Sequence, residues 1–327
     1  MSAVRRKACW TAFLALTVAA CSSDEGPQRV VIPPGSPFRA AADSLASRGV
    51  ISFPRLFAWY ASITGRDRAI KAGTYQFSGS QSWGDIIDAL AEGRGLFHTV
   101  TIPEGWGLLR IVPQLARTLE VPEESVAVAV RDTALLRRLD VPTPTLEGYL
   151  FPDTYQFAPG TTARAAVETM VARFERLWKP EWTARGQAMA MSRHDLVTLA
   201  AIIETEARKA EERPVISAVY HNRLKIGMRL QADPTVQYAL GKHVDRVLFK
   251  DLLIDSKYNT YRHAGLPPGP IASPGASSME AAANPASVPY LYFVAHPDGH
   301  HEFRRTFREH AEAIRQVRGQ QRPPAKR

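Results

Sequence analysis

The stretch from Leu196 to Tyr238 constrains this chain most, because an apolar run there ends in two carboxylates. The apolar spacing predicts a helix from Leu196 to Arg208, with Glu204 and Glu206 near its C-terminal end. A step of 100° per residue places these two acids on opposite flanks of the apolar face, where both can be partly buried. The spacing alone does not choose between them.

Acids at the end of an apolar helix have two interpretations. A carboxyl group held against an apolar wall has a raised pKa and can act as an acid near neutral pH, which suits cleavage of a glycosidic bond. In the other interpretation the helix end is solvated, and its acids pair with Arg208, Lys209 or Arg213. Carboxylates at helix ends are common, so both interpretations stay open at this point.

A dense polar segment follows this helix within one short connection. It contains Asn222, Arg223, Gln231 and Asp233. Because Asp233 precedes a proline, its backbone is expected to be extended. The Asp-Pro-Thr turn can present side chains into a groove, or it can be an ordinary helix start in which Thr235 caps residues 236–240.

The N-terminus predicts export and anchoring. Basic residues 5–7 precede an apolar run, Ala8 to Ala20, which is shorter than the roughly 20 residues that span a bilayer. The run ends at Cys21 in a pattern typical of lipoprotein signals, so a lipid anchor at Cys21 is favoured over a single transmembrane helix. Residues 1–21 are the expected signal and anchor, and residues 22–29 the tether.

Export limits the chemistry that the rest of the chain can perform. The net charge of +9 predicts an anionic partner, but export makes nucleic acid an unsuitable one. The two cysteines, Cys9 and Cys21, both lie in the signal segment, which excludes a disulfide or a thiol nucleophile in the exported body. An acidic cell-wall polymer or an anionic lipid agrees with both observations.

The remaining chain divides by pattern into an α+β module at residues 30–97, a larger domain at 98–318 and a disordered basic tail at 319–327. Ser82 is expected to cap a helix over 83–92. The pattern predicts one helix over 124–138, a buried strand over 290–295 and a last helix over 303–317. Residues 258–275 form a proline-rich loop, either a binding wall or a long connection.

Histidines gather near the C-terminus, at positions 296, 300, 301 and 310. Their spacing matches no familiar zinc pattern, so we expect no metal and no other cofactor. His301 is instead expected to bind substrate or to orient a loop. Aromatic residues such as Tyr155, Tyr258 and Tyr261 can stack on sugar rings, although several of the many aromatic residues must belong to the core.

Several motifs occur in an order that resembles the endolytic murein transglycosylase (YceG-like) family, over roughly Val30 to Arg315. They are TIPEGW (101–106), LEGYLFPDTY (146–155), AIIETEA (201–207), ER (212–213), NRL (222–224), GMRLQADPTVQY (227–238), YNTY (258–261), GLPPGPI (265–271), YLYFVA (290–295) and HEF (301–303). The resemblance implies a LysM-like N-terminal module followed by a mixed α/β catalytic domain, within an α+β fold.

The resemblance also implies the site residues. Glu204 corresponds to the catalytic acid of the family. Four residues correspond to those that line its groove, namely Glu212, Gln231, Asp233 and Asn259. We assign substrate binding to further residues of the same motifs: Asn222, Thr235, Tyr258, Tyr261, Glu147, Tyr155 and His301. Glu206 is expected to brace the site or to pair with Arg213.

The reaction implied is non-hydrolytic cleavage of the β-1,4 bond between N-acetylmuramic acid and N-acetylglucosamine in peptidoglycan. Glu204 would protonate the glycosidic oxygen and then accept the proton of the sugar's 6-hydroxyl group, which attacks C1 and leaves a 1,6-anhydro end. The expected location is the bacterial cell envelope, anchored to a membrane and facing the periplasm, where peptidoglycan synthases are candidate partners. A non-catalytic peptidoglycan-binding scaffold, a water-using muramidase and a metal-dependent wall hydrolase are the alternatives.

Overall fold

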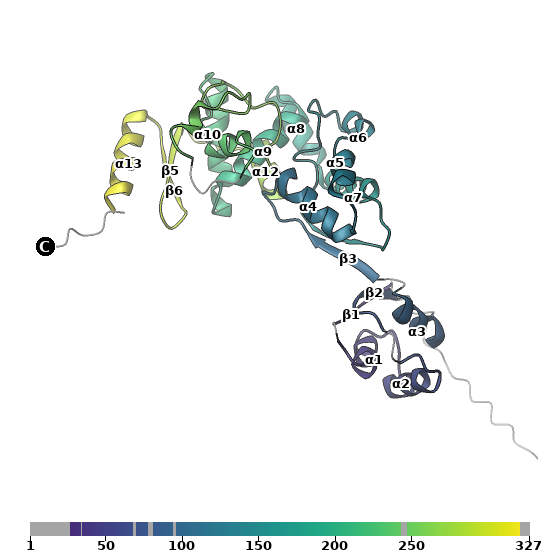
Figure 1. The fold of residues 1–327 in the computed structure, drawn as a ribbon. Helices are drawn as coiled ribbons and strands as arrows, with labels where there is room; N and C mark the ends of the chain where they lie inside the picture. The colour runs from purple at the N-terminus through teal and green to yellow at the C-terminus, as the bar shows by residue number, and fades with distance from the viewer. Residues whose placement is uncertain are drawn as a thin grey trace, which may run out of the picture. The chain divides into compact units, whose positions relative to one another are not determined.

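A computed structural model describes residues 27–33, 35–67, 70–77, 81–93, 96–242 and 247–320. The expected signal and anchor at 1–21, most of the tether, and residues 321–327 of the expected tail lie outside the described residues. The chain divides into two compact units, Met1–Leu96 and Phe97–Arg327. Each unit combines helices with antiparallel strands (Figure 1), which confirms the α+β class.

The first unit contains the strands β1 (Gln28–Ile32) and β2 (Gly73–Phe77) and the helices α1 (Phe38–Ser47), α2 (Pro54–Ile63) and α3 (Trp83–Glu92). The two strands pair antiparallel, with Val30 opposite Tyr75. Alternate residues of both strands are buried and form a separate core with the helices. The unit therefore encloses its own apolar interior.

Helix α3 begins and ends where the sequence predicts. The Ser82 hydroxyl oxygen accepts a hydrogen bond from the backbone N–H of Asp85, and the Asp85 carboxylate accepts one from the backbone N–H of Ser82. Gly93 ends the helix in the left-handed conformation, at a φ of 77°. Both signals act within a few residues, which is why the sequence predicts this helix correctly.

Among its described residues, the second unit holds four strands and most of the helices. In chain order they are β3 (Leu96–Thr101), α4 (Leu108–Leu119), α5 (Glu123–Ala129), α6 (Thr133–Arg138), β4 (Thr154–Phe157), α7 (Ala163–Leu177), α8 (Pro180–Ala188), α9 (Arg193–Glu206), η1 (Ala210–Glu212), α10 (Arg213–Lys225), α11 (Asp233–Ala239), η2 (Asp251–Leu253), α12 (Ala276–Ala283), β5 (Tyr292–Ala295), β6 (His301–Arg304) and α13 (Phe307–Gln320). Strand β3 pairs antiparallel with β4, and β5 pairs antiparallel with β6.

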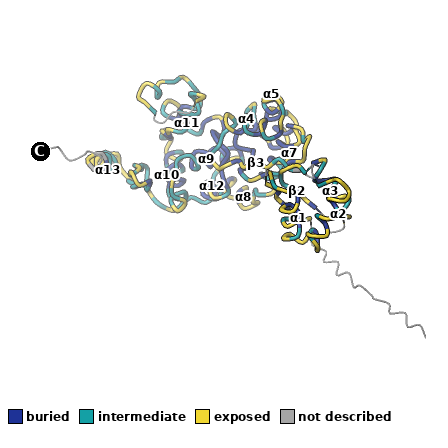
Figure 2. The backbone as a smooth tube through the Cα atoms, turned by 60° about the horizontal axis from the view of Figure 1, so that its bottom comes forward, coloured by how far each residue is buried: buried dark blue, intermediate teal, exposed yellow. Residues whose placement is uncertain are grey.

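Helix α9 is the central element of this unit. Every residue from Leu196 to Ile203 is buried, so the helix is enclosed on all sides rather than along one stripe (Figure 2). Helices α8, α10, α11 and α12 all pack against it. Ser192 and Asp195 form its capping box, as the sequence predicts. A helix held in this way is a rigid support for the carboxylates at its C-terminal end.

Two local predictions about helix starts are wrong. The helix expected over 124–138 is divided into α5 and α6, because the Asp132 carboxylate accepts hydrogen bonds from the backbone of Ala134 and Leu135 and starts a new helix. Thr235 does not cap α11, which begins two residues earlier. Its buried hydroxyl group instead donates to the carbonyl oxygen of Ala232, at 2.7 Å.

The C-terminal predictions also need correction. The strand expected over 290–295 is β5, which is partly exposed rather than buried. Phe303 and Arg304, expected in the last helix, belong to β6, because Phe303 pairs with Phe293 in the hairpin. Helix α13 then continues to Gln320, two residues into the expected disordered tail. Along the described residues, no helix is long and apolar enough to cross a membrane.

Candidate active site

Glu204 lies in the last turn of α9, and both of its carboxylate oxygens are hydrogen-bonded. Oε1 accepts from Nη2 of Arg213 at 2.9 Å, and Oε2 accepts from the backbone N–H of Gly275 at 2.9 Å. The side chain is only 5% exposed. The end of α9 therefore presents Glu204 to a buried, charged contact rather than to bulk solvent.

Arg213, the first residue of α10, connects three elements of the site. Besides its bond to Glu204, its Nε donates to the hydroxyl group of Ser278 in α12, at 3.0 Å. Its side chain is 13% exposed. Of the pairings left open by the sequence, the structure has Arg213 with Glu204, while Glu206 makes a different contact. The guanidinium group is held between α9, α10 and α12 and faces the carboxylate in a fixed direction.

Glu104 is a second carboxylate of this region and is not among the site residues predicted from the sequence. A Cβ atom built on Gly275 would lie 1.9 Å from Oε1 of Glu104, so the Glu104 carboxylate rests directly on the Gly275 backbone. Burial raises the pKa of Glu104, the charge of Glu204 raises it further, and Arg213 lowers it. A signal was present in the sequence: an acid beside a glycine in the turn of the TIPEGW motif.

Glu206 belongs to a neighbouring polar group. Burial and the charge of Asp233 raise the pKa of Glu206 to about 7, against the hydrogen bond from Tyr220. The Tyr220 hydroxyl group donates to Oε1 of Glu206 at 3.2 Å, and the Tyr261 hydroxyl group donates to Oδ1 of Asp233 at 2.5 Å. The structure thus brings two predicted binding residues, Asp233 and Tyr261, to the same side of α9 as Glu206.

Glu147 is buried at the N-terminal end of α4. Its two carboxylate oxygens accept from the backbone N–H of Leu108 at 3.0 and 3.1 Å. Burial raises the pKa of Glu147 to about 7, in spite of backbone hydrogen bonds and one from Tyr238. Tyr258 packs on Tyr238, with ring centroids 4.7 Å apart. Glu147 thus accepts a hydrogen bond from a backbone N–H in the first turn of α4, where the helix itself offers no acceptor.

Four other predicted binding residues use their polar groups within the chain. The Asn222 amide donates to the carbonyl oxygens of Val288 and Tyr290, and the Asn259 amide donates to those of Leu252 and Ile254. The Tyr155 hydroxyl group donates to the carbonyl oxygen of Phe151. The Thr235 hydroxyl group is hydrogen-bonded to the carbonyl oxygen of Ala232 and to the hydroxyl group of Thr260. Gln231 is exposed in a left-handed turn, at a φ of 50°. The hydrogen bonds of Asn222, Asn259, Tyr155 and Thr235 thus join parts of the chain to one another.

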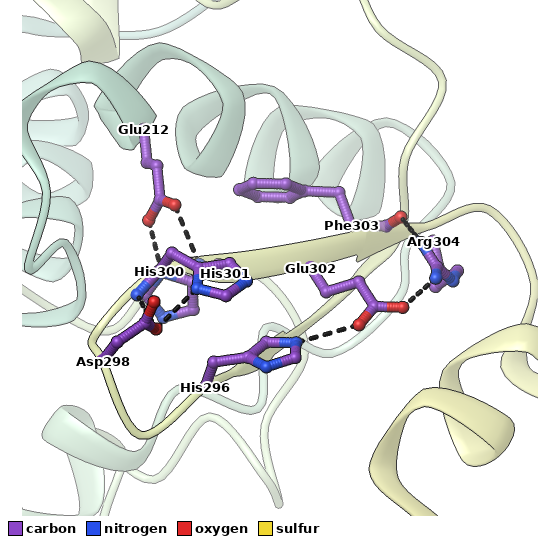
Figure 3. Close-up of polar contacts among 8 residues, drawn as sticks. All are labelled: Glu212, His296, Asp298, His300, His301, Glu302, Phe303 and Arg304. Atoms are coloured by element: carbon purple, nitrogen blue, oxygen red, sulfur yellow. Dashed lines mark hydrogen bonds and ion pairs between the residues drawn. The ribbon is translucent and has the colours of Figure 1, made fainter. Parts of the chain in front are cut away.

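Glu212 connects η1 to the β5–β6 hairpin through His301 (Figure 3). It accepts from the His301 backbone N–H at 2.8 Å, and its Oε2 lies 2.7 Å from the His301 ring nitrogen Nδ1. On the same hairpin, His296 contacts Glu302 and His300 contacts Asp298. No group of three or more His, Cys, Asp or Glu side chains among the described residues is arranged to hold a metal ion.

A cavity of about 1470 Å³ opens at the other end of α9. It is lined by the helix start, by His221 and Asn222 of α10 and by the loop residues 266–268. Glu104, Glu204 and Glu206 do not line it. The volume of a cavity is a weaker guide here than the gathering of acids and Arg213 around Gly275, because only the latter places groups that can transfer a proton.

The chain is similar in sequence and in structure to known proteins. The YceG-like family matches residues 30–316. An endolytic murein transglycosylase of Bacillus subtilis is 37% identical over 298 residues, which cover 86% of this chain and 82% of that protein. One of Streptococcus pneumoniae is 30% identical and covers 81% of this chain, which spans 54% of its length. A crystal structure of a YceG-like protein from Listeria monocytogenes is 33% identical, with a TM-score of 0.65, and the match covers 87% of this chain and 97% of that one.

Proposed function

The chain belongs to the YceG-like family, and from this membership and the surroundings of Glu204 we propose that it is an endolytic lytic transglycosylase of peptidoglycan. It cleaves the β-1,4 bond between N-acetylmuramic acid and N-acetylglucosamine and leaves a 1,6-anhydro end on the muramic acid. The relatives that are 37% and 30% identical are both named endolytic murein transglycosylases. By ending glycan strands during synthesis, such an enzyme limits their length.

The observation that carries the proposal is the position of Glu204. It is a carboxyl group at the end of a helix whose residues 196–203 are all buried, with Arg213 and the Gly275 N–H at 2.9 Å. In the proposed reaction Glu204 donates its proton to the glycosidic oxygen as the bond from C1 to that oxygen breaks. Arg213 and the Gly275 N–H then stabilise the carboxylate that is left, through charge-assisted hydrogen bonds.

The sugar's own 6-hydroxyl oxygen forms the new bond to C1. Because this nucleophile is attached to the reacting ring, it has a high effective concentration at C1, and no activated water is needed. The proposal therefore differs from hydrolysis by a separated pair of carboxylates, in which one acid activates water. The proton of the 6-hydroxyl group leaves as the new bond forms and needs an acceptor beside C1.

The test is mass spectrometry of purified peptidoglycan after digestion by the protein and by its Glu204→Gln variant. We expect new 1,6-anhydro ends with the wild type and none with the variant, whose melting temperature stays near that of the wild type. Reducing ends would identify a water-using muramidase, and retained glycan binding without new ends would identify a scaffold. Loss of activity in a chelator would favour a metal-dependent hydrolase. Cleavage by Glu204→Gln at the wild-type rate would refute the role of Glu204.

We propose that the first unit is a LysM-like module that binds glycan, and that a lipid on Cys21 anchors the chain to a membrane of the cell envelope with the second unit in the periplasm. The separate core of the first unit supports an independent module. Peptidoglycan synthases would then be neighbours of the enzyme. Membrane fractionation tests the anchor: Cys21→Ser should move the protein to the soluble fraction, and an unchanged membrane fraction would contradict it.

A further inference from the structure

Glu104 and Glu204 stand 100 positions apart in the sequence, but both carboxylates contact Gly275. The Gly275 N–H donates to Oε2 of Glu204 at 2.9 Å. On the same residue, a Cβ atom would lie 1.9 Å from Oε1 and 2.8 Å from Oε2 of Glu104. One glycine, at the start of α12, therefore lies between two carboxyl groups.

The turn that carries Glu104 is fixed in place by backbone contacts. The Gly105 N–H donates to the Ser273 carbonyl oxygen at 2.9 Å, and the Ser273 N–H donates to the Trp106 carbonyl oxygen at 2.8 Å. A Cβ atom built on Gly105 would lie 3.8 Å from Cγ of Glu204, so this turn packs directly on the end of α9. The fold thus fixes the backbone that carries Glu104 beside the end of α9.

The two acids differ in access and in surroundings. Glu104 remains exposed to solvent. The Glu204 side chain is 5% exposed, and its oxygens accept hydrogen bonds from Arg213 and Gly275. Burial raises the pKa of Glu104. The charge that Glu204 carries once it has given up its proton raises this pKa further, and Arg213 opposes both effects. A carboxylate with a raised pKa is a stronger base than an ordinary one, and Glu104 can be reached from solvent.

The chemistry of the anhydro product needs two proton transfers on one side of the ring. The leaving oxygen departs from the β face of C1, and the 6-hydroxyl oxygen joins C1 on that same face. A proton donor and a proton acceptor for this reaction must therefore lie beside each other. Two carboxyl groups on opposite sides of the ring, as in inverting hydrolysis, cannot serve it.

We propose that Glu104 is a second catalytic residue: it accepts the proton of the 6-hydroxyl group after Glu204 has protonated the glycosidic oxygen and that oxygen has left C1. This inference rests on the proposed transglycosylase function and replaces the expectation that Glu204 performs both transfers. The bond from C1 to the glycosidic oxygen breaks, and that oxygen takes the proton of Glu204. The bond from C1 to the 6-oxygen forms, and the hydroxyl proton passes to Glu104. Transfer of one proton from Glu104 to Glu204 then restores the starting state.

The experiment compares the full-length wild type with Glu104→Gln, Glu104→Ala and the control Glu124→Gln, which removes an exposed acid of α5. Steady-state rates on soluble glycan strands are measured across pH, with mass spectrometry of the products and melting temperatures. We expect Glu104→Gln to lower kcat by about 100-fold or more, with KM changed little. The acidic limb of its kcat profile should disappear, because this limb reports protonation of the base. Glu124→Gln should resemble the wild type.

Added formate separates a chemical role from a structural one. Formate can replace a missing proton acceptor, so it should restore part of the activity of Glu104→Ala but none of that of Glu104→Gln. If folded Glu104→Ala gains nothing from formate, or if Glu104→Gln keeps kcat within about threefold and the wild-type pH profile, the inference is wrong although the proposed function stands. If the wild type forms no anhydro ends, the proposed function itself fails.

Discussion

Gly275→Ala is a small change that tests the geometry between the two carboxylates. The backbone of Gly275 has φ −77° and ψ 170°, which alanine adopts without strain. The new methyl carbon would lie 1.9 Å from Oε1 and 2.2 Å from Cδ of Glu104. Since carbon contacts are optimal at about 3.5–4.0 Å, the Glu104 carboxyl group must move by roughly 1.5 Å.

The expected effects on stability and on activity differ in size. Glu104 is an exposed side chain that can rotate away, so the main cost is the replacement of a glycine at the N-cap of α12, about 0.5–1 kcal/mol. For a unit of this size that lowers the melting temperature by only about 2–4 °C. A misplacement of about 1 Å at a catalytic group can lower the rate by about 100-fold. We therefore expect kcat to fall by about that factor while the protein stays folded.

The assay measures kcat for release of 1,6-anhydro ends, together with the melting temperature of the same preparation. Gly84→Ala is the matched control, because it makes the same chemical change in α3, where the nearest atom lies 3.7 Å from the new carbon. This control should keep full activity. Two results would refute the reasoning: wild-type kcat in Gly275→Ala, or a fall in melting temperature above about 10 °C, which would mean that α12 moves instead of Glu104.

Two further predictions concern stability. The pKa of Glu206 is about 7 in the folded chain and 4.5 ordinarily, so the stability that its protonation contributes is present below about pH 4.5 and is lost as the pH rises to about 7. Glu206→Gln should reduce this loss in urea unfolding measured from pH 4 to 8, leaving the part due to Glu147, and an unchanged slope would contradict it. Asn222→Ala removes the hydrogen bonds to Val288 and Tyr290 and should cost about 1–3 kcal/mol of unfolding free energy. A raised KM with an unchanged melting temperature would show instead that Asn222 binds glycan.

Predictions that depend on neighbouring residues are the most successful ones. The caps at Ser82 and Ser192 and the apolar spacing of α9 are correct, because the groups involved lie within three or four positions. The order of motifs likewise identifies the family, which the match over residues 30–316 confirms. The failures at Asp132 and at Phe303 come from a cap that divides a helical pattern and from a strand whose partner lies ten residues away.

Only the tertiary structure decides which polar residues share a site. The sequence places Glu204 and Glu206 on one helix, but burial and packing separate them: Glu204 meets Arg213 and Gly275, while Glu206 meets Tyr220. Nothing in the spacing pairs Glu104 with Glu204, since two backbone hydrogen bonds to Ser273 create that contact across the fold. Helix starts and apolar faces follow from short-range interactions that a sequence displays, whereas the surroundings of a carboxylate depend on which distant segments pack against it.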